Sequence, residues 1–97
     1  MSKVIEGNPW VWVVVMDPGG NEQFVGQEDE ENHVSYIPAF LEKEEALKGL
    51  GHLTRDEGHQ YEVQAIRYEN LAGQAGFMGF MIFILTGAGK VLEKIEP

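Results

Sequence analysis

The stretch "PWVWVVVMD", residues 9–17, decides the fold that this sequence predicts. From Trp10 to Met16 it is continuously apolar, rich in β-branched and aromatic residues, and too short for a typical helix. Such a run is typical of a strand that is covered on both faces. Trp10 and Trp12 share one face of this strand, so the pair is either a core anchor or the centre of a protein interface.

The residues that follow predict a hairpin and a third strand. "DPGGNE", residues 17–22, supplies a proline and two glycines for a turn, and "QFVGQ", residues 23–27, should return antiparallel to the first strand. "HVSYIPAFL", residues 33–41, alternates with a period of two. Because Pro38 lacks an N–H, we expect this strand to lie at a sheet edge or to end near Pro38.

The second half of the chain alternates helices and strands. Residues 42–54 have helical spacing, with acids in the first turn where the helix dipole favours them. "HQYEVQAIRYE", residues 59–69, alternates as a half-buried strand, and Asn70 is expected to cap a short helix after it. "FMIFIL", residues 80–85, reads as a buried strand, and a turn at "TGAG" leads to a last strand in "KVLEKI", residues 90–95.

These elements predict an α+β domain with the order β-β-β-α-β-α-β-β. The sheet should be mixed and mostly antiparallel, with the helices packed on it. The chain of 97 residues is expected to form a single domain over 1–97, with an ordered core from about residue 9 to residue 96. An apolar content of 43% is ordinary for a globular protein.

Composition narrows the possible functions. The absence of cysteine excludes disulfides, thiolate zinc sites and cysteine nucleophiles. The N-terminus lacks the apolar run of a secretory signal, and the longest apolar stretch, Ala75 to Leu85, is about half of the ~20 residues that a membrane span needs. We therefore expect a cytoplasmic protein. Its net charge of −9 disfavours binding to nucleic acid or to an anionic membrane surface.

"YIPAFLEKEEA", residues 36–46, resembles the strand-to-helix passage of the SseB-type N-terminal domain and similar small bacterial α/β domains. "YEVQAIRYENL" and "GFMIFILTGAGKVLEKI" also resemble the closing strand, helix and hairpin of that family. The chain departs from the family pattern at Leu41 and Glu42, where a Ser or Thr normally caps the helix. The resemblance implies a non-enzymatic accessory or interaction module, with no catalytic residues to transfer.

Two sequence features that suggest an enzyme are weak. "TGAGK", residues 86–90, has Ile84 where a phosphate-binding loop needs its first glycine and Val91 where it needs Ser or Thr, so it predicts a hairpin turn. The hydroxyl side chains, Ser2, Ser35, Thr54 and Thr86, form no recognisable nucleophile motif. We expect neither an enzyme nor a bound cofactor.

The acidic run "EDEEN", residues 28–32, and the adjacent His33 leave three interpretations open. It is a solvated loop between strands, an acidic contact for a basic partner, or a divalent-metal site. A calcium-binding loop would need a central glycine and a final Glu, and both are missing. In an extended segment Glu28 and Glu30 point to one side, and Asp29 and Glu31 to the other.

The most consistent function is a non-catalytic interaction module of the bacterial cytoplasm that binds a basic protein and forms a homodimer. Dimerisation would cover a sheet face that two small helices leave exposed. The apolar segment "FMGFMIF", residues 77–83, either packs in the core or a dimer interface, or lines a ligand cavity. The alternative is a small metal-dependent enzyme or metal binder using His33 and Glu28–Glu31. The candidate interaction residues are Glu28, Asp29, Glu30, Glu31, His33, Trp10 and Trp12.

Overall fold

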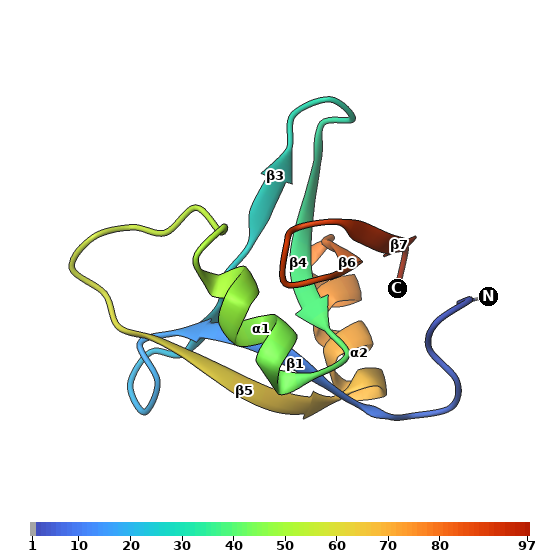
Figure 1. Cartoon of the computed structure of the whole chain (residues 1–97), viewed down its shortest axis with the longest axis horizontal. Helices are drawn as coiled ribbons and strands as arrows, with labels where there is room; N and C mark the ends of the chain where they lie inside the picture. The colour runs from blue at the N-terminus through green and yellow to red at the C-terminus, as the bar shows by residue number, and fades with distance from the viewer. Residues whose placement is uncertain (1) are drawn as a thin grey trace.

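The computed structural model describes residues 2–97 as one mixed sheet with a helix on each face (Figure 1). The strands are β1 (Trp10–Met16), β2 (Gln23–Phe24), β3 (Gln27–Asp29), β4 (Val34–Phe40), β5 (Tyr61–Arg67), β6 (Met81–Leu85) and β7 (Val91–Ile95). The helices are α1 (Lys43–Leu50) and α2 (Tyr68–Met78). The α+β class and the expected order are confirmed. The strand expected at residues 23–27 is shorter, because only β2 pairs with β1, and β3 is an additional short strand that pairs with β4.

The strand β1 organises the sheet. It pairs over its whole length with β5 on one side, and with β4 and β2 on the other. On its other side β4 pairs in parallel with β6, and β6 pairs antiparallel with β7. β5 and β7 therefore form the two outer edges of the sheet, and Figure 1 shows β5 as the outermost strand beneath β1.

The prediction that the Pro38 strand lies at an edge, or ends near Pro38, is wrong. β4 is central and runs through Pro38 to Phe40. On one side, β4 pairs with β3 as far as Tyr36, which faces Gln27. On the same side it pairs with β1 from Ala39, which faces Val13. Pro38 thus lies where the neighbouring strand changes, and a residue without an N–H is tolerated in such an interval.

The two sheet faces carry separate cores. On the α2 face, Leu71 and Ala75 of the helix pack against the buried odd-numbered valines of β1 and against β4 and β6. On the α1 face, Ala46 packs against Phe40, Phe83 and Leu85. β1 is consequently covered on both faces between Val11 and Val15, while Trp10 at its start stays 55% exposed.

Both helices differ in their ends from the sequence-based expectation. α1 begins at Lys43 and stops at Leu50, short of residue 54, and Glu42 forms no side-chain cap. α2 begins at Tyr68, and the predicted Asn70 cap is wrong, because Asn70 lies inside the helix and accepts a hydrogen bond from Gln74 Nε2 at 2.8 Å. The first turn of α2 is capped instead by Asn8, whose Oδ1 accepts the Glu69 N–H at 2.9 Å.

Among residues 2–97 there is no helix that is both long and apolar enough to cross a membrane.

Candidate functional site

The acidic run lies in the β3–β4 hairpin, which projects away from the rest of the sheet (Figure 1). Glu28 and Asp29 belong to β3 and pair with Ser35 and Val34 of β4. The turn occupies residues 30–33, and His33 closes it with a φ of 55°. The expectation of a loop is therefore wrong for the first half of the run, since backbone pairing with β4 makes that half a strand.

Asp29 faces inward and is held by the hairpin and by β7. Its Oδ2 accepts hydrogen bonds from Asn32 Nδ2 at 2.9 Å and from Lys94 Nζ at 3.3 Å, and its Oδ1 accepts the Glu31 N–H at 3.2 Å. The hydrogen bond from Asn32, reinforced by Lys94, lowers the pKa of Asp29 below its ordinary value. This carboxylate therefore stabilises the hairpin and its attachment to the sheet.

Glu28 and Glu30 lie on the side of the hairpin opposite to Asp29 and line a groove of about 570 Å³. Its far wall is formed by residues 54–56, which include Arg55 and Asp56. Gln27 ties this wall to β3, because its Nε2 donates to Thr54 O and its Oε1 accepts the Thr54 N–H, both at 2.9 Å. Apolar surface comes from the rings that also line the groove, Phe24, Tyr61 and Phe80. We call this surface, centred on Glu28, Glu30 and Asp56, the acidic groove.

The two tryptophans lie far from the acidic groove along the sheet. β4 runs from the hairpin at Val34 to Phe40, and Phe40 pairs with Trp12. Trp12 is half-buried against the Phe40 cluster, with Lys43 Nζ 5.7 Å from its ring centre. Trp10 is exposed, and the Arg67 guanidinium lies 4.5 Å from its ring centre. The seven candidate interaction residues therefore do not form one surface.

The structure assembles no metal centre in the part of the chain that it describes. Within residues 2–97 there is no group of three or more His, Asp or Glu side chains with a geometry that could hold an ion. Asp29 is engaged by Lys94, and His59 pairs with Asp17, where Nδ1 and Oδ2 are 2.8 Å apart.

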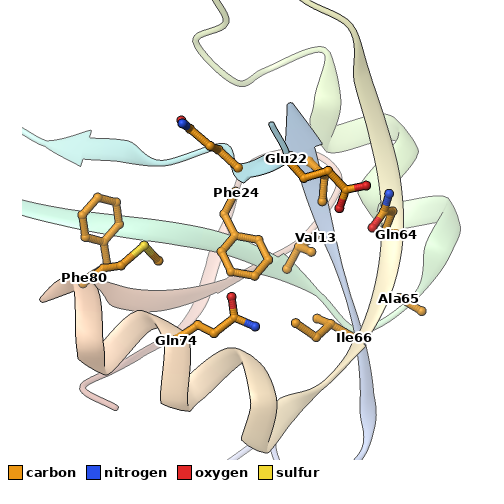
Figure 2. Close-up of a pocket in the computed structure, with 11 residues that line it drawn as sticks. Val13, Glu22, Phe24, Gln64, Ala65, Ile66, Gln74 and Phe80 are labelled. Atoms are coloured by element: carbon orange, nitrogen blue, oxygen red, sulfur yellow. The ribbon is translucent and has the colours of Figure 1, made fainter. Parts of the chain in front are cut away.

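A second hollow, of about 430 Å³, lies on the α2 face between β2, β5 and α2. Val13 and Val15 form its floor, and Phe24, Ile66 and Phe80 form apolar walls. Figure 2 shows the Phe24 ring directed toward the Gln74 amide and Ile66, with Glu22 and Gln64 along the other rim. Met78 and Phe80 of the 77–83 segment thus line this hollow, while Ile82 and Phe83 pack in the two cores.

The fold and these surfaces define a small α+β domain with a mixed sheet, a projecting acidic hairpin, the acidic groove and the hollow on the α2 face. No protein-family model, curated protein or solved structure matches the chain.

Proposed function

We propose that this chain is a non-catalytic interaction module and that its acidic groove receives a basic segment of a protein partner. The observation that carries the proposal is the presence of three acidic residues, Glu28, Glu30 and Asp56, among those that line one groove. The hairpin supplies two of these carboxylates and the loop before β5 supplies the third.

The groove has the chemistry that a lysine or arginine side chain requires. Carboxylates form strong, charge-assisted hydrogen bonds with guanidinium and ammonium groups. The aliphatic stems of the same side chains pack well on aromatic rings such as Phe24 and Tyr61. The groove volume, about 570 Å³, also falls in the range of ~300 to 1,000 Å³ that is usual for ligand sites.

Arg55 is the one cation among the groove-lining residues, and its position leaves the carboxylates accessible. Its guanidinium lies 5.7 Å from the ring centre of Tyr61. No ion pair between Arg55 and an acid is formed within residues 2–97. The net charge of −9 adds a long-range attraction for a basic partner, which raises the rate of encounter.

We also propose that the protein is a homodimer and acts in the bacterial cytoplasm as an accessory protein. The resemblance of residues 36–46 to the SseB-type domain supports a role without catalysis. The edge of the sheet supports the homodimer, and its geometry is developed in the next subsection.

The binding proposal is tested by fluorescence anisotropy with a labelled peptide that alternates Arg and Gly. Glu28→Gln combined with Glu30→Gln should weaken binding about fivefold to thirtyfold, because each lost charge contact is worth on the order of 0.5–1 kcal/mol. The matched control is Glu6→Gln combined with Glu44→Gln, which removes the same charge from exposed positions outside the groove. If both double variants lost affinity for the peptide equally, net charge and not the groove would explain the binding, which would contradict the proposal. Absence of binding to the unmodified protein would also overturn it.

A further inference from the structure

The two edges of the sheet differ in how well they are protected. Exposed strand edges invite pairing with another chain, and proteins usually block them with bulges, charges or short length. β7 has five residues, carries Glu93 and Lys94, and shifts register opposite Ile84 and Leu85. β5 also carries two charges, Glu62 and Arg67, but it has seven residues in unbroken register with β1 and contains no proline, glycine or bulge.

The hydrogen bonds at the ends of β5 show which of its backbone groups face outward. Asp17 donates its N–H to Gln60 O, and Tyr68 donates its N–H to Pro9 O, both at 2.8 Å. Bonded and non-bonded pairs alternate along an antiparallel ladder. The even-numbered residues of β5 therefore bond to β1, and the odd-numbered residues direct their N–H and C=O groups away from the sheet. These residues are Tyr61, Val63, Ala65 and Arg67.

We infer that a second copy of this chain adds to β5, antiparallel, about a twofold axis at Gln64. This inference rests on the proposed homodimer and names its interface. In that register Tyr61 of each copy bonds to Arg67 of the other, and Val63 bonds to Ala65. All four outward-facing residues of each strand then find backbone partners, and the two sheets join into one.

The charges on β5 favour the antiparallel orientation. Glu62 lies near the beginning of the strand and Arg67 at its end. In the antiparallel register Arg67 lies opposite Tyr61 of the partner strand and Glu62 lies opposite Ile66, so no like charges face each other, whereas a parallel copy in register would place Glu62 beside Glu62 and Arg67 beside Arg67.

One exposed apolar side chain of α1, Leu47, bears on the same edge. Glu45 and Lys48 lie on the flank of α1 that packs at Gly87, after β6. Leu47 lies on the opposite flank of the helix and is 53% exposed, and α1 also packs against β5. Because a twofold axis perpendicular to the sheet keeps both α1 helices on one face, the two Leu47 side chains would approach each other across the new strand pair.

The first test measures the dimer dissociation constant by sedimentation equilibrium. Ala65 is exposed, so Ala65→Lys should leave the fold intact and raise this constant at least tenfold by placing charges against the facing strand. Ala65→Pro should do the same, because it removes an outward N–H and leaves the pairing with β1 unchanged. Leu92→Lys is the matched control on β7 and should leave the constant unchanged, with circular dichroism confirming that each variant is folded. A dimer that responds only to Leu92→Lys would overturn the β5 interface while keeping the homodimer.

The second test is amide hydrogen exchange at low and high protein concentration, observed by NMR. In dilute solution the amides of residues 62, 64 and 66 should be protected and those of 61, 63, 65 and 67 should exchange rapidly. At concentrations where the dimer forms, protection should rise at the odd-numbered residues. A dimer without this rise would place the interface elsewhere, and a monomer at high micromolar concentration would overturn both the interface and the proposed homodimer. Neither result affects binding of the basic peptide to the acidic groove.

Discussion

The ring of Tyr36 on β4 stacks on the ring of Phe83 on β6, with centroids 3.9 Å apart and an angle of 8° between the ring planes. Lys94 Nζ lies 5.1 Å from the centre of the Phe83 ring. Burial raises the pKa of the Tyr36 hydroxyl, and the negative charge of Asp29 adds to this effect. The stack therefore joins the only parallel strand pair of the described sheet to the base of the acidic hairpin.

This stack predicts that Tyr36→Ala lowers the free energy of unfolding by about 2–3 kcal/mol, because ring burial and the aromatic contact are both lost. Tyr36→Phe should change it little, since the structure gives the hydroxyl no hydrogen bond within residues 2–97. Urea unfolding followed by tryptophan fluorescence measures both variants. Equal losses for Ala and Phe would show that the hydroxyl, and not the ring, provides the stabilisation.

Two glycines in the helices should respond to alanine in opposite directions. A Cβ at Gly49 of α1 would collide with the Phe40 ring, so Gly49→Ala should destabilise the protein by about 1–3 kcal/mol. A Cβ at Gly73 of α2 would meet no atom within 4 Å, so Gly73→Ala should stabilise the protein by about 0.5–1 kcal/mol. Thermal unfolding of both variants tests the prediction, and Phe40→Leu should relieve part of the cost at Gly49. Stabilisation by Gly49→Ala would contradict the packing of α1 on Phe40.

Asp17 should make a pH-dependent contribution to stability. The hydrogen bond with His59, together with the one from the Gln60 N–H, lowers the pKa of Asp17 below its ordinary value of 3.8. Because the folded-state pKa is the lower one, the contribution is complete above pH ~4 and is lost as the pH falls through the folded-state pKa.

The change to test this is Asp17→Asn, which removes the charge and suits the positive φ of 55° at this position. Its free energy of unfolding should fall less steeply between pH 4 and pH 2 than that of the unmodified protein, as chemical denaturation would measure. In a carboxyl NMR titration, His59→Ala should raise the pKa of Asp17. An unchanged pKa in that variant would show that His59 does not stabilise the carboxylate.

Added metal ions should leave the melting temperature unchanged if the acidic hairpin is a contact surface for a protein. Asp29 already accepts hydrogen bonds from Lys94 and Asn32, and Glu28 accepts one from Ser35 Oγ at 3.1 Å. Calcium, zinc and manganese should each be tested by differential scanning fluorimetry. A rise in melting temperature that vanishes in Glu28→Gln combined with Glu30→Gln and His33→Ala would favour the metal-dependent alternative.

The strands were predictable from sequence because their patterns are local. The apolar run at 10–16 and the alternation at 61–67 each predict a strand without knowledge of the neighbours. The position of β4 was not predictable in this way, because the effect of Pro38 depends on which strands lie beside it. The cap of α2 was missed for a related reason, since Asn8 and Glu69 meet only after folding.

The acidic run was predictable in part. Alternation along an extended chain separates Glu28 and Glu30 from Asp29, and the structure places them on different surfaces. Nothing in the local sequence indicates that Lys94 reaches Asp29 or that residues 54–56 form the opposite wall of the acidic groove. Those contacts depend on the pairing of β6 with β7 and on the Gln27–Thr54 hydrogen bonds.

The pairing of β1 with β5 also has a consequence for the synthesis of the protein. β1 is the most continuously apolar strand, yet its full-length partner is synthesised only after β2, β3, β4 and α1. Proteins are made from the N-terminus at about 5–20 residues per second, so the apolar strand emerges from the ribosome seconds before it can be fully paired. During that interval residues 10–16 lack their full-length partner strand, and apolar surface that is exposed in this way makes a nascent chain prone to aggregation.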